Sequence, residues 1–417
     1  MTTEVLPQSD RRWSVPELAQ FAVVVLLLTG NFTGAVNWGY EYGGFPLKPR
    51  DFNLVLSGLS LALLMFNQPR FCIPALALIT IPLVRFLDSA FLQRYSYVAF
   101  GPHSVYVLMI GGFLLVTTAA VLSLSGSRGP QTAVWVAGIA IVVNSAMNLY
   151  EYLGFATFTR IVGRMSGFHI DPNHSPIIIC LMLGILFTFN KRYWWNMALV
   201  FIGAVGIALT MSRSGMAVFA VMTAIYVVLH FREHTASMIT LAVVGVPLLA
   251  IGIGVMGATS TRQGLSKNED TSGRMEAIYN LDFEKIKSPE RAKDLADGWE
   301  AVTLRPITGY GTGAGSSQWQ PHNQFVTHWI DLGLPGFLQY LGALLTVTIA
   351  CALKRFRGGF CLIPVWLFIP CSQMLMDTTA YWYAFAVAAL VVFPKRYSLT
   401  LRRPVSLVSP QHSGAHA

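Results

Sequence analysis

The chain has 417 residues, of which 54% are hydrophobic and only 12% are charged. A soluble domain carries about 25% charged residues, so this composition excludes an ordinary soluble protein and indicates a polytopic membrane protein. The formal net charge of +9 does not indicate nucleic-acid binding, because the Lys and Arg residues gather in short loops between apolar segments. We expect a lipid bilayer, and no nucleic acid, as the partner of these surfaces.

A membrane-spanning helix needs about 20 apolar residues to cross about 30 Å of hydrocarbon. We therefore predict an all-α polytopic membrane protein with about twelve transmembrane helices. The segments, in chain order, are 16–37, 51–67, 71–87, 103–124, 132–150, 174–189, 193–211, 213–231, 237–258, 333–353, 359–376 and 379–394. The first is expected to remain in the protein, because no small-residue cleavage site follows it.

With twelve spans, alternate loops lie on the same side of the membrane as the two termini. Lys and Arg are more frequent in these loops than in the short loops on the opposite side. The positive-inside rule places the loops richer in Lys and Arg in the cytoplasm and leaves one large polar loop outside. The predicted organisation is a cytoplasmic tail at 1–15, nine spans in 16–258, an external loop at 259–332, three spans in 333–394 and a cytoplasmic tail at 395–417.

The external loop contains two stretches with helical spacing, Arg274 to Ile286 and Arg291 to Leu304, separated by a break at Pro289. A glycine-rich run follows at 309–315. Its backbone N–H groups could cradle a phosphate, or the run could be a turn that returns the chain to the membrane. The residues alone leave both interpretations open.

Three external arginines are candidates for anion binding. Arg213, in the sequence Met-Ser-Arg-Ser-Gly, is expected at the outer membrane interface, where a charge is costly unless it is paired, hydrated or bound to a ligand. Its alternative role is an interface anchor. Arg160 and Arg164 lie about one helical turn apart and could hold a phosphate through bidentate contacts, or they could be solvated loop charges.

His322 is the candidate general base, because it lies where the external loop returns to an apolar segment. An imidazole with a pKa near 6.5 accepts a proton at neutral pH, and nearby arginines would lower that pKa further. Asn323 could orient the imidazole ring or the substrate. His328 and Asp331 could support the site from behind, and the alternative for His322 is a surface role in a loop.

The run from Pro321 to Phe325, followed by Asp331 to Gly336, resembles the hallmark of the O-antigen ligase and polymerase superfamily. That hallmark is a His-Asn pair, an apolar stretch and Gly-x-x-Gly. Further motifs occur in the family order, namely Gly167 with Asp171-Pro172-Asn173, Ser212-Arg213-Ser214-Gly215, Thr271-Ser272-Gly273-Arg274 and Arg305-Pro306-Ile307-Thr308-Gly309-Tyr310-Gly311. The resemblance covers roughly residues 160–340.

The resemblance implies a helical membrane glycosyltransferase that acts at the periplasmic face of the bacterial inner membrane. The donor would be a glycan on undecaprenyl pyrophosphate. The acceptor would be the lipid A-core oligosaccharide in a ligase, or another lipid-linked repeat unit in a polymerase. No metal and no cofactor is implied, and the cysteines show no metal-ligand spacing.

Carried over by position, His322 would activate the acceptor hydroxyl, while Arg213 and Arg274 would bind the pyrophosphate. Arg274 is favoured because Ser-Gly precedes it, although it lacks the tryptophan that family members usually carry a few residues later. Arg291 has the better spacing to the Pro-x-x-Gly-x-Gly turn and is the alternative. The further candidates for substrate binding are Arg160, Arg164, Arg291, Asn323 and Arg305.

Two alternative functions remain open at this point. The first is an O-antigen or exopolysaccharide polymerase, because nothing in the residues names the acceptor. The second is a lipid or solute transporter, which would be expected to show internal inverted repeats and ionisable groups near the bilayer midplane. No convincing repeat is visible, and the notable ionisable residues cluster at the outer edge, with Arg85 as the main exception.

Overall fold

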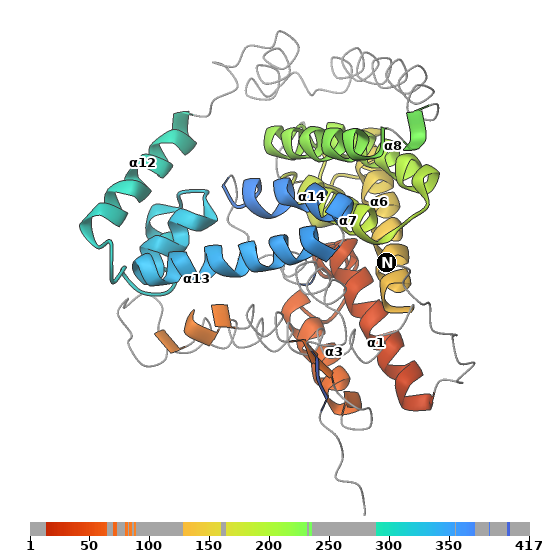
Figure 1. Ribbon diagram of the computed structural model, residues 1–417, viewed down its shortest axis with the longest axis horizontal. Coiled ribbons are helices and arrows are strands. Elements are labelled where there is room, and N and C mark those ends of the chain that lie inside the picture. The colour runs from red at the N-terminus through yellow and green to blue at the C-terminus, as the bar shows by residue number, and fades with distance from the viewer. Residues whose placement is uncertain are drawn as a thin grey trace, which may run out of the picture.

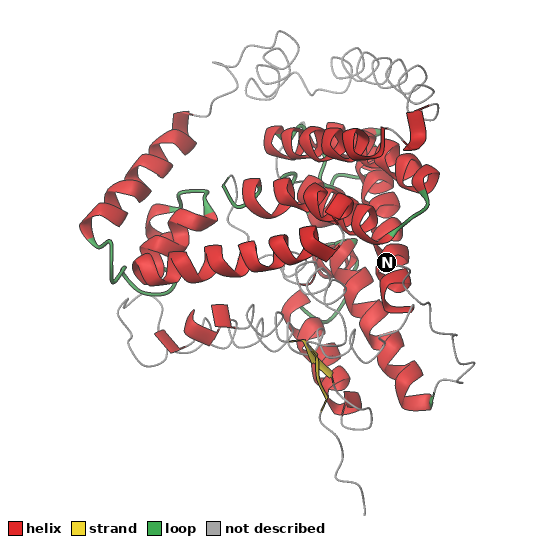
Figure 2. Ribbon diagram, viewed as in Figure 1, coloured by secondary structure: helices red, strands yellow, loops and turns green. Residues whose placement is uncertain are grey.

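The computed structural model describes residues 14–64, 70–72, 80–81, 83–85, 87–88, 128–159, 164–231, 233–235, 289–354, 356–371, 383 and 398–400. Within these ranges the protein is largely helical, and a single pair of short strands is the exception (Figure 2). The predicted segments 103–124 and 237–258, and most of 71–87 and 379–394, lie outside the described residues.

The first half of the described chain forms six α-helices and one 3-10 turn. Their bounds are α1 Val15–Phe32, α2 Ala35–Glu41, α3 Pro49–Leu64, α6 Arg128–Tyr152, η2 Gly167–His169, α7 His174–Phe189 and α8 Tyr193–Thr210. A further helix covers Arg213–Phe231. Ser14 and Glu17 form a capping box at the start of α1, which fixes where that helix begins.

The second half contains three α-helices and two π-helical turns. Their bounds are α12 Pro289–Leu304, η4 Gly315–Trp319, α13 Gln324–Lys354, α14 Phe356–Ile363 and η5 Pro364–Phe368. The helix predicted from Arg291 to Leu304 is confirmed as α12. The helix predicted from Arg274 to Ile286 lies outside the described residues.

Four described helices are long and apolar enough to cross a membrane: Val15–Phe32, Gln131–Tyr152, Tyr193–Thr210 and Arg213–Phe231. They coincide closely with four of the predicted segments, except that 16–37 was drawn too long. Gly34 adopts a left-handed backbone conformation between α1 and α2 and ends the first span there. Shorter apolar helices cover His174–Phe189 and Gly359–Phe368. The fold is thus that of a helical membrane protein.

The main core is organised around α7, in which every residue from Ser175 to Thr188 is buried. Helices α6, α8 and α14 lie against it (Figure 1). Gly206 of α8 lets that helix approach Ser145 of α6, where a Cβ atom would collide with the serine. Small residues at such crossings are how helices pack closely in membranes, where lipid gives little hydrophobic drive.

The all-α prediction missed one antiparallel strand pair. Strand β1 (Arg70–Cys72) pairs with β2 (Ser398–Thr400), so that Phe71 lies opposite Leu399. Ser398–Thr400 was predicted in the cytoplasmic tail and Arg70 in a cytoplasmic loop, but Phe71 and Cys72 were predicted to begin the helical span 71–87, and that start is wrong because both residues are in β1. The pairing depends on a contact between distant parts of the chain, which local sequence patterns do not encode.

The segment predicted as the external loop contributes to a second, small hydrophobic core. It is formed by Ala301, Val302, Ala314, Val326 and Ile330, with Leu295, Tyr310, Trp319 and Trp329 packed around it. These side chains come from α12, the glycine-rich run, η4 and the first turns of α13. In Figure 1 α12 lies near the N-terminal end of α13, away from the α7 core. This unit carries the candidate site.

Candidate functional site

His322 lies in a strained turn just before α13. Its φ angle is +49° and that of Gln320 is +44°, so two residues without the freedom of glycine adopt left-handed backbone conformations around Pro321. Such conformations cost on the order of 1–3 kcal/mol each and persist where the surrounding structure imposes them. The turn holds the imidazole half-buried, with 34% of its side chain exposed.

Asn323 forms the N-cap of α13. Its side-chain oxygen accepts hydrogen bonds from the N–H groups of Phe325 (2.9 Å) and Val326 (3.1 Å). Its carbonyl accepts from both the N–H and the hydroxyl of Thr327. The asparagine of the His-Asn pair therefore fixes the first turn of α13, directly after His322.

Helix α12 approaches His322 closely because Gly298 faces Pro321. A Cβ atom at position 298 would come within 3 Å of the proline ring. Asp294 and Arg291 lie one and two turns earlier on the same helical face. Asp294 Oδ2 lies 3.8 Å from His322 Nε2, which is an ion-pair distance rather than a hydrogen bond.

The surroundings of His322 lower its pKa below the usual value. Partial burial is the largest cause, because it disfavours the charged imidazolium, and the positive charge of Arg291 adds to the effect. Asp294 acts in the opposite direction and raises the pKa. The ring is therefore neutral at pH 7 and able to accept a proton, while a carboxylate lies close enough to stabilise the imidazolium that would form.

The glycine-rich run is joined to a break in α13 and uses its N–H groups there. Tyr310 and Gly311 donate to the carbonyls of Ile330 and Asp331, at 2.7 and 2.8 Å. Gly309 (φ +65°) and Gly333 (φ +69°) face each other so closely that a Cβ atom on either would collide with backbone. Of the two interpretations left open, this geometry favours the turn over the phosphate cradle.

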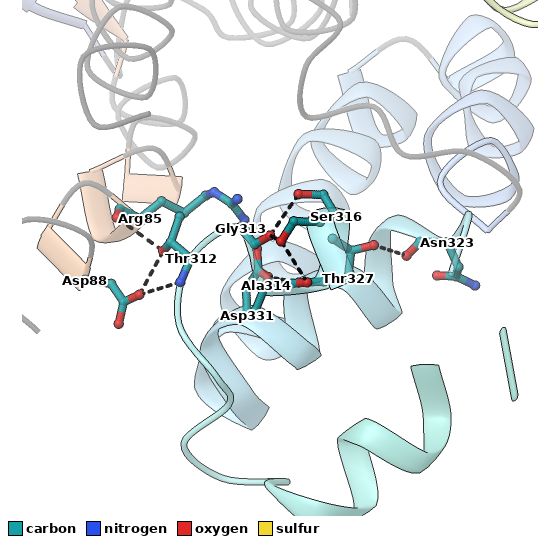
Figure 3. Close-up of polar contacts among 11 residues, drawn as sticks. Arg85, Asp88, Thr312, Gly313, Ala314, Ser316, Asn323, Thr327 and Asp331 are labelled. Atoms are coloured by element: carbon teal, nitrogen blue, oxygen red, sulfur yellow. Dashed lines mark hydrogen bonds and ion pairs between the residues drawn. The ribbon is translucent and has the colours of Figure 1, made fainter. Parts of the chain in front are cut away.

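A buried polar network holds this joint from the other side. Asp331 Oδ1 accepts from the N–H of Gly315 at 2.7 Å, and Asp331 Oδ2 forms an ion pair of 2.8 Å with Arg85. Asp88 Oδ2 accepts from the N–H and the hydroxyl of Thr312, at 2.7 and 2.9 Å (Figure 3). Arg85, the intramembrane exception in the sequence, is thus paired.

Arg213 opens the helix Arg213–Phe231 and is partly exposed. Met211 before it has a left-handed backbone (φ +51°), and Ser212 accepts a hydrogen bond from the N–H of Gly215. This sharp turn separates α8 from the helix that Arg213 begins. Gly215, in the first turn of the next helix, packs against Pro176 of α7.

Arg164 supports the same turn from a buried position. Its Nε donates to the carbonyl of Thr210 at 3.0 Å, and its guanidinium also donates to the side chain of Asn173 at 2.9 Å. Thr210 is the last residue of α8. The contacts of Arg164 therefore join the loop between α6 and α7 to the turn that precedes Arg213.

The remaining candidate arginines lie apart or outside the description. Arg305 is exposed, with its guanidinium 4.8 Å above the ring of Tyr310, a cation–π distance. Arg160 and Arg274 lie outside the described residues. Among the residues that the structure describes, no three His, Cys, Asp or Glu side chains gather as metal ligands.

Sequence reasoning missed Asp294, which lies beside His322, and Glu151, a buried carboxylate that accepts hydrogen bonds from the backbone of the loop after α6. Asp294 was one of many charges in the external loop, and its proximity to His322 depends on Gly298. The signal was available: Asp294 and Gly298 share a face with Arg291 on the predicted helix. Glu151 gave no local signal, because its partners are backbone groups 7 to 16 residues away.

Comparison with known proteins identifies the region that contains these residues. Residues 198–341 match the family described as O-antigen ligase, whereas no curated protein matches the chain. The matched region includes Arg213, Arg274, Arg291 and His322, and it ends within α13 beyond the Gly333 break. Over this region the chain is similar to the O-antigen ligase family.

Proposed function

We propose that the protein is a membrane glycosyltransferase that moves an O-antigen glycan from undecaprenyl pyrophosphate to the lipid A-core oligosaccharide. The observation that carries this proposal is the half-buried His322, which lies beside Arg291 and Asp294 of α12 within the family domain. A neutral base beside a fixed cation suits a reaction that deprotonates a hydroxyl while releasing an anion.

In the proposed step, an acceptor hydroxyl attacks the anomeric carbon of the donor from the face opposite the pyrophosphate. The new bond joins the acceptor oxygen to the anomeric carbon, and the bond from that carbon to the pyrophosphate oxygen breaks. The imidazole of His322 takes the hydroxyl proton, and the leaving oxygen keeps the bonding electrons. The anomeric centre is inverted, and Asp294 stabilises the imidazolium.

Arginines neutralise the leaving group, so that no metal is required. We assign this role to Arg213 and to one arginine of the external loop. Arg291 is supported by its electrostatic action on His322, and Arg274 remains the candidate from its motif. Guanidinium groups suit pyrophosphate because they offer paired donors and keep their charge when partly desolvated.

The other candidate residues receive supporting roles. Arg164 is buried, and we propose that it positions the turn that carries Arg213. Arg305 is exposed and available to the glycan of the donor or acceptor, and Arg160 is proposed to bind the same substrates. Asn323 acts on substrate through the α13 cap that it forms.

We place the site at the periplasmic face of the inner membrane, with both termini cytoplasmic and the loop 259–332 outside. The polyprenyl tail would then stay in the bilayer, while the glycan extends into the aqueous space. This division of the donor between bilayer and water explains why a polar unit with its own small core is inserted between apolar helices.

A reconstituted assay tests this function. Purified protein in proteoliposomes receives a defined undecaprenyl-pyrophosphate-linked glycan together with two competing acceptors, lipid A-core and a second lipid-linked repeat. We expect glycan transfer to lipid A-core, release of undecaprenyl pyrophosphate and no effect of a metal chelator. The exposed Lys293→Met variant is the control for preparation. Elongation of the lipid-linked repeat in place of transfer to lipid A-core would instead assign a polymerase.

A further inference from the structure

Residues outside the family-matched region hold the scaffold of the site. Arg85 and Asp88 precede residue 198, where the match begins, by more than a hundred positions. Both side chains are nevertheless buried against the glycine-rich run and the start of α13, with 4% exposed in each case. In Figure 3 the segment that carries Arg85 and Asp88 lies directly beside Thr312 and Gly313.

Asp331 closes the loop that contains His322. Gly315 and Asp331 are 16 residues apart in sequence and are joined by the hydrogen bond from the Gly315 N–H to Asp331 Oδ1. His322 lies between them, in the left-handed turn that links η4 to α13. Any displacement of the Asp331 carboxylate therefore moves both ends of the segment that carries His322.

Arg85 determines where that carboxylate lies. The side chain of Asp331 is fully buried, and a buried carboxylate is costly unless a cation and hydrogen-bond donors compensate it. Arg85 provides the cation at 2.8 Å, and the Gly315 N–H provides a donor. Because Asp88 holds Thr312 close by, Arg85 is anchored to the same loop that it supports.

We propose that Arg85 and Asp331 form a positioning pair that sets the orientation of His322, with Asp88 and Thr312 as its second attachment. Neither residue of the pair contacts His322 directly. They act through the closed segment 315–331 and through the joint between the glycine-rich run and α13. This inference rests on the proposed function only for its catalytic consequence, because the orientation of His322 can be measured without substrate.

The test uses full-length protein in nanodiscs and diethyl pyrocarbonate, which modifies accessible neutral histidines. Mass spectrometry compares the modification rate of His322 with that of His234, a distant histidine stacked on Tyr193. The variants are Arg85→Met, Asp331→Asn and the charge-preserving Arg85→Lys. Arg192→Met, at an exposed arginine before α8, is the matched control.

We expect Arg85→Met and Asp331→Asn to raise the rate at His322 relative to His234 about fivefold, as local opening releases the half-buried ring. Arg85→Lys should restore the wild-type ratio, and Arg192→Met should not change it. Asp331→Asn keeps an acceptor for Gly315, so it carries the test if Arg85→Met does not yield folded protein. An unchanged ratio in Asp331→Asn, or an equal rise at both histidines, would overturn the proposal.

A transfer assay on the same variants separates this inference from the proposed function. If both hold, kcat falls while the KM for the acceptor stays constant, and Arg85→Lys recovers kcat. A changed labelling ratio with unchanged transfer would uphold the positioning pair and contradict His322 as the base.

Discussion

Two regions of the molecule combine an arginine with a carboxylate, and they use these residues differently. In the outer loop after α6, Glu151 is buried and accepts four hydrogen bonds, from the N–H groups of Phe158, Thr159, Ser166 and Gly167. Arg164 of the same loop is also buried and donates to the carbonyl of Thr210 and the side chain of Asn173. At the start of α13, Asp294 and Arg291 instead lie around a partly exposed histidine.

The difference shows how bonding and exposure separate scaffold from chemistry. Four donors converge on the Glu151 carboxylate, so its charge stabilises the backbone of the loop. Asp294 lies 3.8 Å from a titratable ring, and its exposed fraction is 38%, so its charge can respond to a proton that moves. Each region combines an arginine with a carboxylate of the same charge, and the environment of the two groups distinguishes the regions.

The largest effect that follows from this comparison is on folding. Glu151→Leu should abolish accumulation of folded protein, because each buried N–H left without a partner costs about 1–3 kcal/mol and four would lose theirs. Asp294→Leu should leave folding intact. Size-exclusion profiles and thermal unfolding in detergent measure both. Equal stability of the two variants would remove the distinction drawn here.

The second effect is on transfer. Arg291→Gln should lower the rate by about a hundredfold, the range seen when one group that stabilises developing negative charge is removed. The protein should remain as stable as the wild type, because Arg291 is partly exposed and is not one of the residues that form the small core. Arg164→Gln is the contrasting variant, and its main effect should be a lower yield and a lower thermal stability of the protein. A full rate in Arg291→Gln would return the role to Arg274.

The third effect is a shift in the pH dependence of transfer. Burial and Arg291 lower the pKa of His322, so the neutral base persists below the usual pKa of 6.5 and the rate falls only at lower pH. Arg291→Gln should move this acid limb to higher pH. Asp294→Asn should move it to lower pH, because that carboxylate raises the pKa. Movement of the acid limb in the same direction in Arg291→Gln and in Asp294→Asn would contradict the assignment of this limb to His322.

The smallest effect concerns the helix cap. Asn323→Ala should destabilise the protein by about 1 kcal/mol, because two N–H groups at the start of α13 lose their acceptor. Asn323→Asp, which keeps a capping oxygen, should restore the thermal stability. If Asn323 binds substrate directly, the KM for the acceptor would rise in both Asn323→Ala and Asn323→Asp. Thermal stability would not reveal this binding role.

Helix positions were largely predictable from the sequence, because hydrophobic length and polar breaks are local features. Segment 193–211 corresponds to α8, and Arg291 to Leu304 to most of α12. The start of α13 at Gln324 was missed as a helix boundary because the span was defined by hydropathy. The break at Gly333 was also missed, since it depends on the approach of the glycine-rich run.

The site was predictable in its principal residue but not in its arrangement. His322 stood out because an imidazole met the edge of an apolar segment. Asn323 was expected only to orient the ring or the substrate, and its role as a cap was missed together with the start of α13. The pairing of Arg85 with Asp331 joins residues from distant segments, and no local pattern carries that information.

The most direct test of the account is His322→Gly in the reconstituted transfer assay, with and without added imidazole. Glycine accepts the left-handed backbone at this position, so the turn should persist and only the base should be lost. We expect transfer to lipid A-core to disappear and to recover partly when imidazole is supplied. Near-normal transfer by the variant without imidazole would contradict the account.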